Sequence, residues 1–213
     1  PSPCNDHVYF IMKHHIKHSF IRSKQILGNV AIIITLSCCE DQIDEINIME
    51  KGVVINEINY NSSDNFDVGD WVEIYNSSDD AMDLSLWLLK DEEDEHIFTI
   101  PSNTIISPNQ YIVFCKDTAS FIVLFPEVDN YYGDLGFGLG GGGDQIRLFD
   151  SAGSLADFIE YDDSPPWPVE ADGGGATLEL KNPSTDNANW ENWSASEGYG
   201  TPGALNSVYS DDI

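Results

Sequence analysis

Clusters of carboxylates are the residues of this sequence best suited to do chemistry. Two loops each bring three of them together, namely Asp64, Asp67 and Asp70 in the first and Asp79, Asp80 and Asp83 in the second. Calcium takes about six to eight oxygen ligands, and neighbouring carboxylates can supply them. Neither loop has the D-x-[DN]-x-[DN]-G spacing of a calcium-binding loop, so solvated charge is the simpler interpretation. We therefore expect that the protein has no cofactor. The alternative that stays open is weak binding of Ca²⁺ at these loops.

Three further candidates have simpler structural interpretations than catalysis. His96 has no Cys or His nearby in the sequence with which to bind zinc. Cys115 ends an apolar run, where a lone Cys usually packs as a small hydrophobic side chain. Asp157 shares one face of an alternating segment with Leu155 and Ile159. If that face is inward, its carboxylate requires hydrogen bonds, most simply from loop N–H groups. Because no catalytic partner is identifiable, we expect the protein not to be an enzyme.

A glycine-rich stretch over residues 133–143 is a candidate phosphate-binding loop. It contains seven glycines, but neither a Lys with Ser or Thr nor a helical pattern follows it. An Asp follows instead. The stretch therefore predicts a flexible hairpin loop.

The charge distribution divides the chain into two segments. The formal net charge of the 213 residues is −28. Residues 1–37 hold four bases and one acid, whereas the chain from Cys38 onward holds five bases and 36 acids. Affinity for nucleic acid depends mainly on Lys and Arg that neutralise phosphates, so a body of this sign excludes a nucleic-acid partner. A basic start before an acidic remainder indicates a leader followed by a separate folded body.

The leader has the order of a secretory signal. Bases follow Met12, and the apolar run over residues 26–36 comes next. This run is too short for a membrane span, which needs about 20 residues. We predict a lipoprotein-type signal peptide over residues 12–37, preceded by upstream translation over residues 1–11.

The end of the apolar run resembles a bacterial lipobox, in which a Cys after a small residue is lipidated. Cys38 follows the small Ser37, whereas Cys39 has the better residue, Leu36, at the third position upstream. Both cysteines therefore stay candidates for lipidation. The resemblance implies an exported lipoprotein on the outer membrane or cell surface of a Gram-negative bacterium. An acidic tether over residues 38–52 is expected to hold the body away from that membrane.

The body alternates short runs of branched and aromatic residues with turn residues. Strands are expected over residues 53–60, 71–75, 82–89, 97–100, 110–115, 145–149, 155–161 and 176–180. One helical turn is expected over residues 118–125, with Asp117 or Thr118 as its cap and Pro126 beyond its end. Strands at this spacing with almost no helical period predict an all-β antiparallel sandwich.

Motifs that follow one another in a family's order extend from about residue 53 to 206. They lie at residues 54–58, 70–76, 83–87, 98–101, 106–113, 143–150, 153–161, 192–194 and 200–206. The series resembles the lamin tail domain in its bacterial form, an immunoglobulin-like sandwich. One departure is Leu86 before Trp87, where the family often has Gly.

The resemblance implies structural work for the motif residues, which are Asn56, Glu57, Trp71, Glu73, Asn76, Asp157, Tyr161, Trp193, Gly200, Pro202 and Gly203. Pro202 and Gly203 belong to a turn that brings the last segment back to the sandwich.

The resemblance also implies a non-catalytic binding or scaffold module over residues 53–207, followed by a tail over residues 208–213. We expect it to meet a membrane through its lipid anchor and to bind a protein or glycan of unknown identity. The alternative is a calcium-dependent hydrolase, or an accessory fragment of a larger surface enzyme whose catalytic domain lies beyond residue 213.

Overall fold

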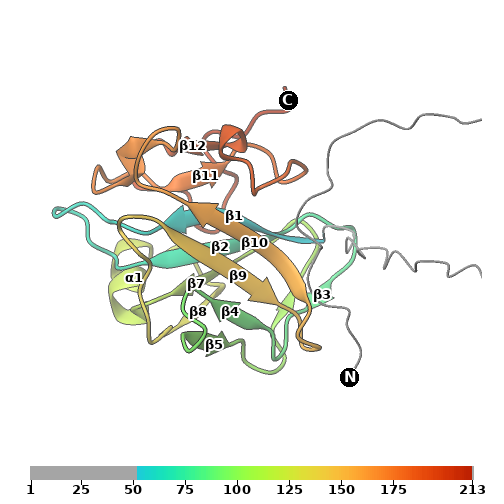
Figure 1. Cartoon of the computed structure of the whole chain (residues 1–213). Coiled ribbons are helices and arrows are strands. Elements are labelled where there is room, and N and C mark those ends of the chain that lie inside the picture. The colour runs from blue at the N-terminus through green and yellow to red at the C-terminus, as the bar shows by residue number, and fades with distance from the viewer. Residues whose placement is uncertain (1–51, 213) are drawn as a thin grey trace, which may run out of the picture. The chain divides into compact units, whose positions relative to one another are not determined.

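The first strand, β1 (Val53–Asn59), is buried at every position, because it has strands on both edges and a layer on both faces. The computed structural model describes residues 52–212, and β1 lies inside its larger sheet (Figure 1). That sheet has the order β12-β11-β1-β2-β7-β8 and is antiparallel except for the parallel pair β7 and β8. The other strands of this sheet are β2 (Trp71–Asn76), β7 (Tyr111–Cys115), β8 (Tyr131–Gly133), β11 (Leu178–Leu180) and β12 (Trp193–Ala195).

A second, four-stranded antiparallel sheet covers one face of the first. Its order is β10-β9-β4-β5, and its strands are β4 (Leu88–Lys90), β5 (Ile97–Thr99), β9 (Asp144–Phe149) and β10 (Leu155–Tyr161). A small ladder joins β3 (Met82–Asp83) to β6 (Ile105–Ile106). Short 3₁₀ turns, η1 (Val169–Ala171) and η2 (Trp190–Asn192), lie on either side of β11 in the sequence. The all-β immunoglobulin-like sandwich expected from the sequence is confirmed.

The apolar core lies between the two sheets. Ile58, Ile74, Leu89, Ile146 and Leu148 are each at most 1% exposed and belong to one cluster. Strand residues alternate between faces, so the neighbours of Ile58 and Ile74 along β1 and β2 point to the other side of the larger sheet. There a second cluster forms around Trp71 and Val113.

The helix α1 (Thr118–Leu124) covers this second cluster through Phe121, which is fully buried. The Asp117 carboxylate accepts hydrogen bonds from the N–H groups of Ala119 and Ser120. Asp117 is therefore the cap, as one of the two alternatives predicted. The helix ends before Pro126, which lacks the N–H that a continued helix needs.

The strand expected over residues 82–89 is wrong, because a turn divides it into β3 and β4. The Trp87 N–H donates to the Leu84 carbonyl oxygen at 3.1 Å, and Leu86 between them has a φ of 64°. An alternation of apolar and polar residues over 82–86, which is typical of a strand, therefore concealed a turn. The departure from the family's Gly places a leucine in a left-handed conformation.

We expect Leu86→Gly to raise the free energy of unfolding by about 0.5–1 kcal/mol. Relief of the left-handed strain is worth about 1–2 kcal/mol, while the added freedom of Gly in the unfolded chain costs about 0.5–1 kcal/mol. Little packing is lost, because Leu86 is 55% exposed. Urea unfolding checks this, with Leu155→Gly as the control. Leu155 is 51% exposed but has no positive φ, so its replacement must lower stability. Equal losses for the two variants would contradict the assignment of strain to Leu86.

Among residues 52–212, no helix has the length and apolar character needed to cross a membrane.

Candidate functional site

Three neighbouring strands place a row of glutamates across the larger sheet. Glu57 of β1 lies opposite Glu73 of β2 and opposite Glu179 of β11, and all three are fully buried. By alternation, Glu73 shares a face of β2 with Trp71, whereas the next residue, Ile74, points to the other face and into the core. The row is therefore on the face that points away from the second sheet, where residues 200–208, here called the C-terminal segment, cover it.

Glu57 and Glu73 hold the turn of the C-terminal segment. The Glu57 Oε1 atom accepts from the Thr201 N–H at 2.9 Å and from the Thr177 hydroxyl at 2.6 Å. The Glu73 Oε2 atom accepts from the Gly203 N–H at 2.6 Å. These bonds explain why the turn around Pro202 returns to the sandwich. The sequence predicted the return but not its bonding partners.

Glu179 holds the remainder of the C-terminal segment. Its carboxylate accepts from the hydroxyls of Thr201 and Ser207 at 2.8 and 2.7 Å and from the Val208 N–H at 3.1 Å. Beyond this point, the Ser210 N–H donates to the Lys181 carbonyl oxygen at 3.0 Å. Residues 208–210, expected as a tail, are therefore hydrogen-bonded to the sheet.

The buried glutamates share an electrostatic environment that opposes full ionisation. Burial first, and then the neighbouring Glu73 and Glu179, raise the pKa of Glu57 well above its usual range. Burial also raises the pKa of Glu73 to about 8, although the bonds from Gly203 and Asn56 act in the opposite direction. At neutral pH the row therefore retains at least one proton, because carboxylates this close cannot all be charged away from water.

Three buried asparagines hold segments of the chain against the larger sheet. The Asn56 side-chain amide donates to Glu73 Oε1 at 2.9 Å and to Asn206 Oδ1 at 2.8 Å. The Asn206 amide donates in turn to the carbonyl oxygens of Asn56 and Leu180. On β2, the Asn76 amide donates to the carbonyl oxygens of Asp80 and Ile106. Asn56 and Asn76 thus bind segments distant in sequence to the sheet.

Asp157 bridges the two sheets. Its Oδ2 atom accepts from the Ile55 N–H of β1 and from the Asn187 amide, both at 2.7 Å. The expected donors were loop N–H groups, but one donor is a strand N–H. β11 pairs with β1 only from Glu57 onward, so the Ile55 N–H lies beyond the end of that ladder. The Trp193 indole N–H donates to the Asn187 carbonyl oxygen at 2.8 Å, which fixes the loop that carries Asn187.

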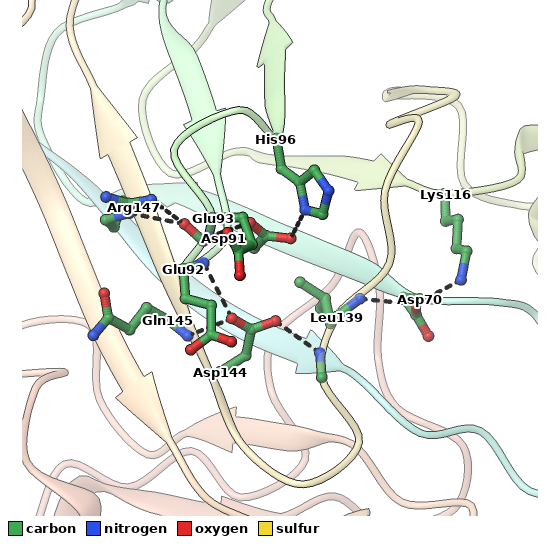
Figure 2. Close-up of polar contacts among 11 residues, drawn as sticks. Asp70, Asp91, Glu92, Glu93, His96, Lys116, Leu139, Asp144, Gln145 and Arg147 are labelled. Carbon is green, nitrogen blue, oxygen red and sulfur yellow. Dashed lines mark hydrogen bonds and ion pairs between the residues drawn. The ribbon is translucent and has the colours of Figure 1, made fainter.

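The glycine-rich stretch is a loop, but the expected hairpin is wrong, because β8 and β9 on either side of it belong to different sheets. Acidic side chains hold the loop in place. The Leu139 N–H donates to Asp70 Oδ2 at 2.9 Å, and the Gly140 N–H donates to Asp144 Oδ2 at 2.7 Å (Figure 2). The Tyr161 hydroxyl donates to the Gly140 carbonyl oxygen at 3.0 Å. Backbone N–H groups that a phosphate loop would offer to a ligand are therefore used by this chain's own carboxylates.

Part of the acidic run over residues 91–95 is organised around two bases. The His96 Nδ1 atom lies 2.7 Å from Asp91 Oδ2, and Arg147 donates to the Asp91 carbonyl oxygen (Figure 2). The hydrogen bond to Asp91 raises the pKa of His96. Arg147 also pairs with Asp94 at 3.0 Å. This arrangement resembles part of a His–Asp catalytic pair, but within residues 52–212 no nucleophilic side chain is hydrogen-bonded to His96.

The six aspartates proposed for calcium lie in two separate places. Asp64, Asp67 and Asp70 line a polar pocket of about 480 Å³, in which Asp70 pairs with Lys116 at 3.2 Å. Asp79, Asp80 and Asp83 lie exposed in the next loop and beside it. Within residues 52–212, no three His, Cys, Asp or Glu side chains are grouped to hold a metal ion.

Calcium binding at these loops therefore stays a prediction. If it occurs, calcium at about 0.1–1 mM must raise the melting temperature more than sodium does at equal ionic strength. Asp67→Asn or Asp80→Asn must then remove most of the difference. An effect no larger than that of sodium would leave the aspartates as solvated charge.

Sequence reasoning missed several members of the network, namely Thr177, Glu179, Asn187 and Asn206. The segment over residues 176–180 did contain a signal, because Thr177 and Glu179 alternate with Leu178 and Leu180. Polar residues at every second position usually indicate a solvated face. Here the C-terminal segment covers that face, so the polar residues are buried. The lipidation candidates Cys38 and Cys39 lie outside the described residues.

The fold and its network define a class of protein, a β-sandwich in which buried acids bind the end of the chain to the first sheet. The sequence model of the Lamin Tail Domain family matches residues 49–163. The chain belongs to the lamin tail domain family. This membership supports a non-catalytic binding or scaffold module in general terms.

Other comparisons give a more distant likeness. A solved structure of a DUF4876 family protein from Bacteroides thetaiotaomicron VPI-5482 is similar over 62% of each chain, with 12% sequence identity and a TM-score of 0.45. The chain therefore spans less than two thirds of that protein. No curated protein matches the sequence.

Proposed function

We propose that this protein is a lipid-anchored, extracytoplasmic binding or scaffold module without catalytic activity. The family supports the general class, and the basic leader with its lipobox-like end supports the anchor. The acidic composition supports a partner other than nucleic acid, because phosphates and this body repel one another.

One observation carries the non-catalytic part of the proposal. Glu57, Glu73, Glu179 and Asp157, the buried or partly buried acids of the network, all accept hydrogen bonds from this chain's own groups. A general acid or base must instead reach a substrate atom within hydrogen-bond distance. Carboxylates used in this way stabilise the fold and leave ligand binding to the surface.

Activity is tested by incubating the purified protein with a broad panel of hydrolase substrates. We expect no turnover that exceeds the background of an Asp157→Asn variant. Turnover by the wild type that Asp157→Asn abolishes would overturn the proposal, provided that circular dichroism shows the variant to be folded.

We expect the double variant Cys38→Ser/Cys39→Ser to be released from membranes. Two acyl chains attached to one cysteine provide stable anchoring. They are attached through a thioether, which serine cannot form because it has no sulfur. Fractionation of cells checks this, and the two single variants show which cysteine is lipidated. Unchanged membrane retention of the double variant would instead indicate an uncleaved anchor. A wild-type protein found in the cytoplasm would contradict both forms of anchoring.

A further inference from the structure

A pocket of about 230 Å³ opens beside the C-terminal segment, and three tyrosines line it. Tyr75 of β2 and Tyr111 of β7 are opposite one another in the sheet, with ring centroids 4.8 Å apart. Tyr209 lies beyond the C-terminal segment and is 38% exposed. The pocket is thus built from both ends of the domain, and it forms only when the C-terminal segment is in place.

The rest of the lining is apolar or uncharged. Leu180, Pro183 and Leu205 contribute aliphatic surface, and Leu205 is 57% exposed. The polar lining residues are asparagines and serines. A ligand with an apolar stem could therefore contact Leu205 and Pro183 while its head meets the tyrosine rings.

The charge around the pocket favours a cationic head. Residues 52–212 contain 31 acids and four bases, Lys90, Lys116, Arg147 and Lys181, and none of these bases lines the pocket. The Tyr209 hydroxyl donates to the Asp211 carboxylate at 2.5 Å, which places an acid beside the pocket. Aromatic rings in an electronegative site attract cations through their faces.

The size of the pocket restricts the ligand further. At about 30 Å³ per water molecule, it holds on the order of eight waters. Sites for drug-sized molecules span about 300–1,000 Å³. A single side chain fits, whereas an oligosaccharide or a large cofactor does not. A neutral sugar ring would also gain nothing from the surrounding charge.

We infer that the pocket between Tyr75, Tyr111 and Tyr209 binds a lysine or arginine side chain presented by a partner protein. This inference rests on the proposed function as a binding module and names the chemistry of its partner. The ammonium or guanidinium group lies against the tyrosine rings, and its aliphatic stem packs on Leu205. The Asp211 carboxylate beside Tyr209 and the excess of acids over bases around the pocket stabilise the charge.

Calorimetric titration with blocked five-residue glycine peptides tests the inference. The central residue is lysine, arginine or norleucine. Norleucine keeps the aliphatic stem of lysine but lacks its charge. Methyl glucoside is the neutral sugar probe, and all titrations use one ionic strength. We expect the lysine and arginine peptides to bind at least tenfold more tightly than the norleucine peptide. Equal binding of lysine and norleucine, or binding of the sugar alone, would overturn the inference.

Variants separate the pocket from the general attraction of an acidic protein for cations. Tyr111→Ala and Tyr209→Ala should weaken the lysine peptide about fivefold or more, whereas Tyr111→Phe, which keeps the ring, should change it less than about threefold. Tyr199→Ala is the matched control, since Tyr199 is 47% exposed but stacks on Phe66. If Tyr111→Ala does not fold, Tyr209→Ala still decides.

Binding that is unaffected by Tyr209→Ala would show attraction by surface acids alone and would overturn the inference. So would the absence of binding by both basic peptides up to about 10 mM. Neither result affects the membrane anchoring or the substrate panel, so a failure here is distinguishable from a failure of the proposed function.

Discussion

Replacement of Gly200 by alanine is expected to lower the free energy of unfolding by about 2–4 kcal/mol. Gly200 has a φ of +92°, and an added Cβ would lie 2.5 Å from Glu57 Oε1 and 2.8 Å from Thr177 Cγ2. Neither atom can move away easily, because the Glu57 carboxylate is buried and bonded to Thr177 and Thr201. Backbone strain of about 1 kcal/mol and overpacking of about 1–3 kcal/mol therefore add.

Gly198 provides a matched control two residues earlier. Its φ of +74° is similar, but an added Cβ would have no atom within 4 Å. Gly198→Ala should thus cost only the strain, about 1 kcal/mol. Chemical unfolding of both variants at one pH checks the difference. Similar losses would show that Glu57 does not constrain the C-terminal segment as described.

Stability is expected to fall as the pH rises from about 5 to above 8. The pKa of Glu73 is 4.5 in its ordinary state and about 8 in the fold, and that of Glu57 is raised in the same direction. The fold therefore favours the neutral acids. Their contribution is fully present below about pH 4.5, and it is lost as the pH rises through the folded value. For Glu73 the loss is on the order of 3–5 kcal/mol.

His96 changes stability in the same window and the same direction. Its pKa is raised by Asp91, so the stabilisation from the charged imidazole is also lost as the pH rises. A His96→Gln background removes this contribution. The remaining slope then reports the buried glutamates, because most exposed carboxylates have finished titrating near pH 5.

Glu73→Gln in that background should flatten the slope between pH 5 and 8. The variant should also be less stable by about 1–2 kcal/mol at pH 5. In glutamine an NH₂ group replaces one carboxylate oxygen, and this group cannot accept the hydrogen bond from Asn56. Urea unfolding at intervals of one pH unit checks both effects. Parallel curves with and without Glu73 would contradict a raised pKa at this residue.

Local patterns predicted the parts of the fold that depend on neighbouring residues. Alternation and turn residues placed β1, β2 and β10, and Asp117 was one of two cap candidates because a cap acts over about three residues. The same reasoning failed at Leu86, where the chain turns through an apolar residue. The signal of a turn was the Gly that the family often has at this position, because Gly adopts a positive φ readily.

The polar network could be predicted only in part. Asp157 was expected to be hydrogen-bonded, but Asn187 as its partner depends on the packing of β10 beside β1. Glu57, Glu73 and Glu179 come together through strand register, which one sequence does not state. Polar side chains that usually face solvent are buried here because a later segment covers them.

The position of the last segment also governs the order of folding. Asn56 and Asn206 bond directly although 150 residues separate them, and β1 cannot complete its edge until β11 arrives. Closing so large a loop is entropically slow and gives no reward until late contacts form. Until then the side chains of Glu57 and Glu73 remain hydrated and, near neutral pH, charged, and they repel one another. We therefore expect the docking of the C-terminal end to be a late step in the folding of the domain.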